Sequence, residues 1–246
     1  LSFVFFFRHS GGIHLGFKGF HFEKKMARAL YSVAIPSGIM LSLPSILVGI
    51  LNGILSGLSQ VGVAVFGLYF KLQTFVYMPG NGLIQGMRPI LSYNYGAGKR
   101  ERMRQTLLYS CLVTGLLMLL GMLLFLLIPE QIMGIFQAEG ELLASGSQAL
   151  RILSLGFPIS TVGVVLSGVF EALGRGGRPL AVSLIRQLLV VPPLAWFLSG
   201  PLGLGLTGVW ISFPVAESLA VLLALFLYRN WWQEEQRKCG KMQRTG

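Results

Sequence analysis

The stretch TLLYSCLVTGLLMLLGMLLFLLI, residues 106–128, decides the fold class of this chain. It runs for 23 residues without a charged side chain. A helix of about 20 apolar residues crosses the hydrocarbon core of a bilayer. The stretch therefore predicts a transmembrane helix.

Five more apolar runs flank this one, so we predict an all-α, polytopic membrane protein with a bundle of about six transmembrane helices. Of the 246 residues, 53% are hydrophobic and 12% are charged, and the charged share is about half that of soluble domains. We expect residues 1–31 to hold the end of a preceding helix and a basic linker, 32–230 the bundle, and 231–246 a basic tail. The other predicted spans are 32–57, 61–92, 142–173, 180–199 and 204–228.

Positive charge alternates between the loops. The formal net charge is +11, and Lys and Arg gather before the first span, after the second, after the fourth and in the tail. The intervening loops are uncharged or acidic. Cytoplasmic loops collect Lys and Arg, so the pattern predicts six spans in the plasma membrane with both ends in the cytoplasm. A nucleic-acid partner would not require this alternation, and we expect none.

A polar stripe follows the second span. Gln73, Tyr77, Asn81 and Gln85 are spaced by four residues and therefore share one face of a helix. A polar side chain that faces lipid has no hydrogen-bond partner there, which costs free energy. We expect these four residues to line a cleft.

Charged residues inside spans are functional candidates, because an ionisable group in the bilayer is costly. Lys71, Arg186 and Glu217 are predicted to be buried charges that act in transport. Lys71 could pair with Glu217, and Arg186 could serve Glu217 instead. Arg88 and Glu171 lie nearer the cytoplasmic ends, where we expect solvation of Glu171.

The first span carries glycine every fourth residue, at Gly49, Gly53 and Gly57. This spacing lets two helix backbones approach closely. We expect a packing seam along this face.

Motifs of catalysis are missing from the sequence. Lys99 follows a short glycine-containing turn that lacks the first glycine and the final Ser or Thr of a phosphate-binding loop. The chain contains no aspartate, and its histidines and cysteines have no metal-ligand spacing. We therefore expect a protein that is not an enzyme, holds no metal or cofactor, and draws energy for transport from a gradient of H⁺ or Na⁺.

Several segments resemble the multidrug and toxic compound extrusion (MATE) family, and the resemblance runs from about residue 24 to about residue 232. The segment after the second span is similar to the family's inner loop, and the others are similar to parts of its eighth, tenth and twelfth helices. The four segments are GMRPILSYNYGAGKR (86–100), FGLYFKLQTFVYMP (66–79), FEALGR (170–175) and GVWISFPVAE (208–217).

The resemblance implies one lobe of a twelve-helix transporter that exports cationic or amphipathic drugs in exchange for protons or sodium. By this match the chain corresponds to helices seven to twelve of the family, and Leu1 to Phe7 corresponds to the end of helix six. The resemblance therefore implies that an N-terminal six-helix half is the missing partner. Acids that some members carry on helices seven and eight have no counterpart here, so no coupling residue is carried over. Two alternatives stay open: a flippase for lipid-linked oligosaccharide from the same superfamily, in which Arg88, Arg151 and Arg186 would serve the headgroup, and an inactive half-transporter.

Overall fold

The computed structural model describes the backbone of residues 23–245 and the side chains of residues 23–237. The predicted helix end at Leu1 to Phe7 lies outside the described residues. The described range contains helices and no strand: α2 (Lys24–Leu58), α3 (Gln60–Gly96), α4 (Arg100–Leu127), α5 (Pro129–Ile135), α6 (Gly140–Ser154), α7 (Gly156–Ala172), α8 (Gly177–Leu184), η1 (Ile185–Val190), α9 (Val191–Ser199) and α10 (Gly205–Thr245).

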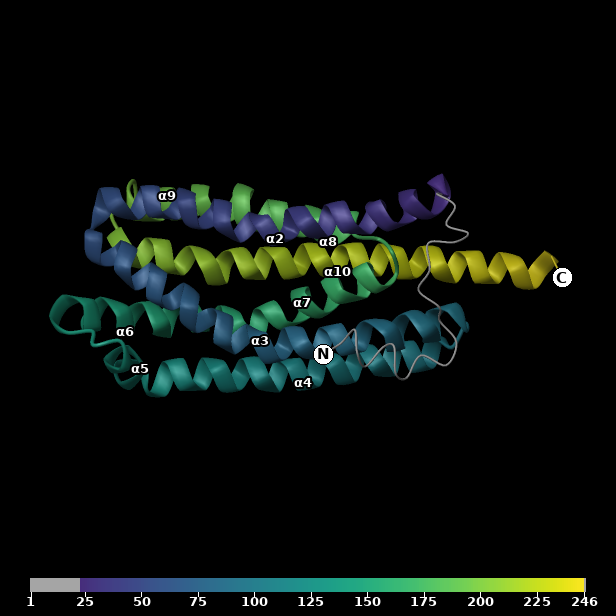
Figure 1. Ribbon diagram of the computed structural model, residues 1–246, viewed down its shortest axis with the longest axis horizontal. Helices are drawn as coiled ribbons and strands as arrows, with labels where there is room; N and C mark the ends of the chain where they lie inside the picture. Colours follow the sequence, from purple (N-terminus) through teal and green to yellow (C-terminus); the bar gives the residue numbers. More distant parts are fainter. Residues whose placement is uncertain (1–22, 246) are drawn as a thin grey trace, which may run out of the picture.

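The long helices run side by side along one axis (Figure 1). The start of α2, the α3–α4 turn, the α7–α8 turn and the end of α10 lie toward the right of the view, and α5 and the α9–α10 turn lie toward the left. All the described basic loops therefore belong to one end of the bundle, which we call the basic end. The alternation of charge along the sequence thus corresponds to the two ends of the bundle.

The described residues form up to six spans. Five helical segments are long and apolar enough to cross a membrane, and α6 with α7 forms a sixth that bends by 46°. The predicted span 142–173 is therefore broken rather than continuous. The break falls at Leu155, where Leu155 N–H bonds to Ile152 O instead of continuing the α-helical ladder.

The fifth span changes its helical type. Between α8 and α9 the segment η1 is a π-helix, and Val191 N–H donates to Arg186 O, five residues earlier. Pro192 and Pro193 follow directly, and neither can donate a backbone hydrogen bond. Short π-helical turns inside α-helices often mark functional sites.

Both predicted ends of the bundle need correction. α2 begins at Lys24, eight residues before the predicted start at Ser32. α10 continues as helix past residue 230, and Trp231 is fully buried against Leu91 and Phe170. The predicted tail therefore begins inside the folded bundle, because an indole of this size contributes too much apolar contact to be left in water.

The core is built from large side chains of α2, α3, α7 and α10. Phe66 and Trp210 stack with their ring centroids 6.3 Å apart, and Leu51 and Phe157 are buried in the same cluster. Gly208 lies where α10 crosses the end of α9, and a Cβ there would come within 2.6 Å of the Leu198 carbonyl carbon. This position therefore requires glycine for the close approach of two backbones.

The predicted glycine seam on α2 is not packed within the described residues. A Cβ added at Gly49, Gly53 or Gly57 would meet no atom within 4 Å. On the same side of α2, Ile46 and Ile50 are 48% and 40% exposed. The bundle therefore leaves this apolar face of α2 uncovered.

Candidate functional site

A cleft opens in the wall of the bundle between α2, α3, α7, η1 and α10. It consists of two adjoining hollows of about 600 Å³ and about 540 Å³. The two hollows share seven lining residues, which are Pro44, Asn81, Gln85, Val164, Arg186, Gln187 and Glu217. They form one continuous site, and each hollow is within the size range of small-molecule pockets.

Helix α3 supplies one wall of the cleft. Gln73, Tyr77, Asn81 and Gln85 all line the larger hollow, as the spacing of four residues along a single helix face requires. The structure thus brings the four predicted residues together. That they contact a transported solute stays a prediction.

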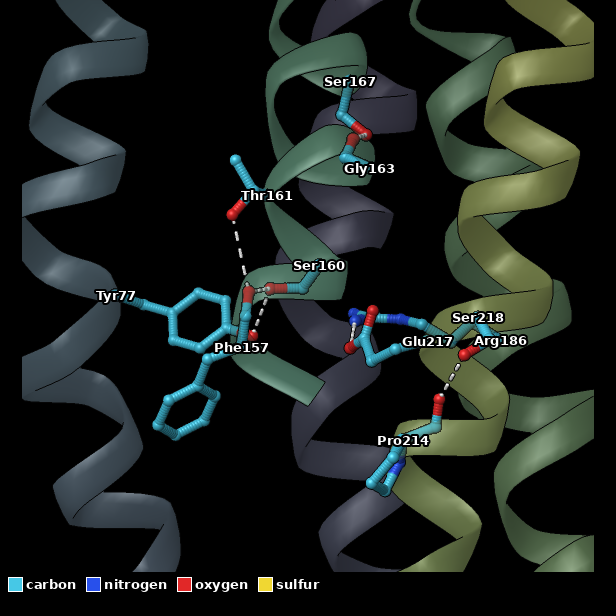
Figure 2. A network of polar contacts seen from close by, with 10 residues as sticks. All are labelled: Tyr77, Phe157, Ser160, Thr161, Gly163, Ser167, Arg186, Pro214, Glu217 and Ser218. Atoms are coloured by element: carbon cyan, nitrogen blue, oxygen red, sulfur yellow. Dashed lines mark hydrogen bonds and ion pairs between the residues drawn. The ribbon is translucent and has the colours of Figure 1, made fainter. Parts of the chain in front are cut away.

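The Tyr77 hydroxyl joins α3 to α7. Its oxygen lies 2.7 Å from Ser160 Oγ, and Ser160 Oγ also donates to the carbonyl of Phe157 at 2.8 Å (Figure 2). The ring of Tyr77 meets the ring of Phe157 edge to face, with centroids 5.6 Å apart. Tyr77 is therefore held both by its hydroxyl and by its ring, so its position in the cleft wall is well determined.

Arg186 and Glu217 form an ion pair in the cleft wall. The Arg186 guanidinium on η1 donates to Glu217 Oε1 on α10, and the two side chains are 29% and 13% exposed (Figure 2). α7 comes close here, since a Cβ on Gly156 would lie 3.5 Å from Glu217 Cγ. One turn before Glu217, Pro214 interrupts the α10 ladder, and Ser218 Oγ donates to its carbonyl at 2.9 Å. The pair thus lies at irregular points of two helices.

Lys71 does not occupy the predicted place. Its side chain is exposed, it does not line either hollow, and in the described part of the chain it makes no ion pair. Two residues along a helix correspond to a rotation of about 200°, so Lys71 points away from the face that carries Gln73. The predicted pairing of Lys71 with Glu217 is wrong, and the alternative partner Arg186 is the one observed.

Glu171 was expected to be solvated, and this expectation is also wrong. Arg88 Nη2 lies 2.5 Å from Glu171 Oε2, and the Glu171 side chain is 12% exposed. Both residues line the smaller hollow. The pairing compensates the burial of the carboxylate, because an unpaired buried charge is strongly unfavourable.

Sequence reasoning missed Ser160 and Gln187. Ser160 belongs to an apolar helix, and nothing in its neighbourhood predicts a contact with Tyr77. Gln187 is 5% exposed and lines both hollows. Its position beside Arg186 and shortly before Pro192 was the available signal, because a polar pair next to two prolines is unusual in a membrane span.

The chemistry of the cleft is that of binding. Aromatic rings, amides, hydroxyls and ion pairs line it, and among the described residues no three His, Cys, Asp or Glu side chains gather in a way that could hold a metal. Such a surface can hold an amphipathic solute of drug size by apolar contact and a few oriented polar groups.

Six spans around a polar cleft in the bilayer define the class: a polytopic α-helical membrane protein with a solute-sized cavity. The chain belongs to the MatE family, since the family profile described as MatE matches residues 29–197. The predicted resemblance is therefore confirmed. The relatives and solved structures that the chain matches are described as multidrug export proteins and transporters.

Relatives and solved structures agree with this assignment. The multidrug export protein MepA of Staphylococcus aureus is 25% identical over 228 residues, and MepA of Staphylococcus saprophyticus is 24% identical over 224. A structure described as an outward-facing multidrug resistance MATE family transporter of the MOP superfamily superposes with a TM-score of 0.88 at 20% identity, covering 96% of this chain and 54% of that one. A MOP superfamily transporter from Pyrococcus furiosus superposes with a TM-score of 0.86 at 20% identity, covering 93% of this chain and 51% of that one.

The chain spans about half the length of the curated relatives that it matches. The alignment with each MepA protein covers 91% of this chain and 49% of the relative. The described helices therefore correspond to one half of such a protein.

Proposed function

We propose that this chain forms one six-helix lobe of an ion-coupled antiporter that exports amphipathic drugs, organic cations among them, across the plasma membrane. The observation that carries the proposal is the cleft of α3 and α10, in which aromatic side chains, an amide-bearing stripe and an ion pair face one cavity of about 600 Å³. The multidrug export function of the MepA relatives supports the same assignment.

The partner of this lobe is a second six-helix half. The chain's half-length coverage of its relatives supports this, as does the uncovered face of α2, where Gly49, Gly53 and Gly57 lie open beside exposed apolar side chains. A face this apolar either contacts lipid or packs against another helix, and small residues favour helix packing in membranes.

The basic end of the bundle faces the cytoplasm in this proposal. The bases of the α3–α4 and α7–α8 loops and of the start of α2 lie at this one end (Figure 1). The positive-inside rule supports a cytoplasmic position for that end.

Glu217 is the residue at which we place coupling. A proton on its carboxylate would remove the charge that holds Arg186, and a substrate ammonium group would compete for the same oxygens. Besides Arg186 on η1, Tyr77 on α3 lines the same larger hollow as this carboxylate. Arg88 and Glu171 line the same smaller hollow as the pair. Competition of ion and substrate for one site couples their exchange when that site opens alternately to the two sides of the membrane.

The test is efflux of ethidium from bacterial cells that lack their own major drug exporters and express the full-length gene product. Glu217→Gln should reduce the efflux rate at least about tenfold, because glutamine neither takes up a proton nor carries the negative charge that attracts a cationic dye. Arg151→Gln is the matched control. Arg151 lies outside the cleft, and its Nη2 is 3.6 Å from Glu130 Oε1. Collapsing the proton gradient or removing sodium, one at a time, identifies the coupling ion.

Unchanged efflux in Glu217→Gln would refute the coupling role, and absence of efflux with the unsubstituted protein would favour an inactive half. The flippase alternative needs cleft arginines that are free to bind an anionic headgroup. Arg88 and Arg186 are each occupied by a carboxylate, which supports drug export over headgroup translocation. Translocation of a lipid-linked oligosaccharide that is lost in Glu217→Gln would reverse this preference.

A further inference from the structure

The loops at the basic end of the bundle differ in how their positive charges are compensated. In the α7–α8 turn, Arg175 Nη2 lies 3.4 Å from Glu235 Oε1, and Arg178 Nη2 lies 3.7 Å from Glu234 Oε2. Both carboxylates belong to α10, which passes this turn. The two arginines of the turn therefore each have a counter-charge from the protein itself.

The start of α4 lacks such compensation. Four exposed basic side chains lie there within six residues, namely Lys99, Arg100, Arg102 and Arg104. Within the part of the chain that the structure describes, none of the four makes an ion pair, and Glu101 between them accepts a hydrogen bond from Gln105. Like charges this close repel each other, so the segment gains free energy when an anion binds beside it.

These bases lie where the bundle meets the surface of the membrane. The charge-free stretch 106–128 begins two residues after Arg104. One residue rises 1.5 Å along a helix, so the Arg104 Cα lies about 3 Å before the apolar stretch along the helix axis. Long basic side chains at the end of a span extend to the headgroup level of a bilayer. The anion nearest to this patch in a membrane is therefore a lipid phosphate.

Helix α10 gives the patch a fixed wall. Arg100 Nη2 donates to the Glu235 carbonyl at 3.2 Å, and Met103 is 4% exposed in a cluster that holds α4 against α10. Tyr228 and Trp232 pack against the same cluster, and their rings stack with centroids 6.1 Å apart. Tyrosine and tryptophan are the side chains that favour the membrane–water interface, so the wall beside the bases is suited to the headgroup region.

Arg104 lies on the side of α4 that faces this wall. It follows Arg100 by four residues and therefore shares its helix face. Leu107, three residues further on, packs in the same cluster as Trp232. Arg104 thus lies between two residues that both contact the α10 side, and in the described part of the chain its guanidinium makes neither an ion pair nor a hydrogen bond.

A second basic patch, at the start of α2, has no comparable wall. Its exposed bases are Lys24, Lys25 and Arg28. The side chains of Met26 and Tyr31 beside them are themselves 69% and 58% exposed. This patch carries the same number of exposed bases as the set Lys99, Arg102 and Arg104, and it lies at the same end of the bundle (Figure 1). It therefore offers a matched comparison.

We infer that the start of α4 and the adjoining face of α10 form a binding site for the headgroup of an anionic phospholipid. Arg102 and Arg104 bind the phosphate, Lys99 adds to the positive potential, and Tyr228 and Trp232 contact the lipid where its headgroup joins its acyl chains. This inference goes beyond the proposed function, because it concerns a lipid of the surrounding membrane and not the exported solute.

The test is a titration of the purified full-length protein, in a non-ionic detergent, with dioleoylphosphatidylglycerol and separately with dioleoylphosphatidylcholine. Native mass spectrometry gives the Kd of the first lipid that binds. We expect the anionic lipid to bind at least about tenfold more tightly than the zwitterionic one, because each Lys or Arg near an anionic headgroup contributes a factor of about five. The two lipids share their acyl chains, so the difference reports on the headgroup.

Two triple variants locate the site. K99Q with R102Q and R104Q should reduce the advantage of phosphatidylglycerol below about threefold. The matched control, K24Q with K25Q and R28Q, removes the same number of charges at the same end and should keep the full advantage. All six side chains are exposed, so both variants should fold, and their melting temperatures without added lipid should agree with that of the unsubstituted protein.

Three results would overturn the inference. The first is an advantage of phosphatidylglycerol below about threefold in the unsubstituted protein. The second is an equal loss of that advantage in the two triple variants, which would indicate a general attraction to the basic end and not a site at α4. The third is loss of lipid binding when inorganic phosphate replaces chloride at equal ionic strength, which would assign the site to free phosphate. Ethidium efflux tests the proposed function separately, so either can fail without the other.

Discussion

The guanidinium of Arg186, in the π-helical turn η1, contacts the carboxylate of Glu217 on α10, 31 residues further along the chain. The contact joins two spans at the point where both depart from regular α-helix. It also lies on the wall of both hollows of the cleft. We therefore expect substitutions in this pair to change both the stability of the bundle and its proposed activity.

Glu217→Gln should lower the free energy of unfolding by roughly 1–3 kcal/mol, because it leaves Arg186 without a counter-charge in a partly buried position. R186Q with E217Q should be less destabilised than the sum of the two single variants, which a double-mutant cycle measures. Unfolding is followed by circular dichroism in mixed micelles. Strictly additive effects of the two substitutions would contradict the structural pairing.

Tyr77→Phe should cost about 0.5–1.5 kcal/mol of stability, because it removes the hydroxyl that lies 2.7 Å from Ser160 Oγ. The edge-to-face contact with Phe157 is kept, so the ring should stay in place. Tyr93→Phe serves as the control, since Tyr93 is 72% exposed. Equal melting temperatures for the two variants would argue against the α3–α7 hydrogen bond.

Gly208→Ala should destabilise the bundle by about 1–3 kcal/mol or more, because the new Cβ would lie 2.6–2.8 Å from backbone atoms of Leu198 and Ser199. Gly67→Ala is the matched control. It places the same methyl group in open space on a helix, where alanine is favoured over glycine by up to about 1 kcal/mol. Thermal unfolding of both variants decides, and a tolerated Gly208→Ala would disprove the close approach of α9 and α10.

Trp231→Ala should cost roughly 3–5 kcal/mol, the range for truncating a fully buried aromatic side chain. Trp196→Ala tests the same substitution at a position that is 61% exposed and should cost far less. The two variants are compared by their yield and by their melting temperature in detergent. A loss of stability at Trp231 as small as that at Trp196 would mean that the segment from residue 231 is not packed against the bundle.

Lys71→Gln should leave ethidium efflux within about twofold of the unsubstituted protein and change stability by no more than about 0.5 kcal/mol, as is usual for exposed sites without a special contact. Arg186→Gln is the comparison and should lower both the rate of ethidium efflux and the stability of the protein. Strong loss of efflux in Lys71→Gln alone would assign this lysine a role outside the cleft that α3 and α10 line.

The amino-acid sequence was sufficient for the features that depend on local periodicity and composition. The 106–128 run and its neighbours predicted the six spans, and alternating loop charges predicted which turns share one end. The spacing of Gln73, Tyr77, Asn81 and Gln85 predicted one shared face, because a helix repeats every 3.6 residues whatever surrounds it. Motifs such as residues 86–100 were specific enough to indicate the family.

Only the tertiary structure decided which groups meet across helices. The choice of Arg186 over Lys71 as the partner of Glu217, the pairing of Arg88 with Glu171 and the docking of Trp231 all depend on the rotation and depth of each span. Those quantities are determined by side-chain packing among residues far apart in the sequence. The bend at Leu155 and the π-turn before Pro192 shift that rotation further, so the partners of charged residues could not be read from spacing alone.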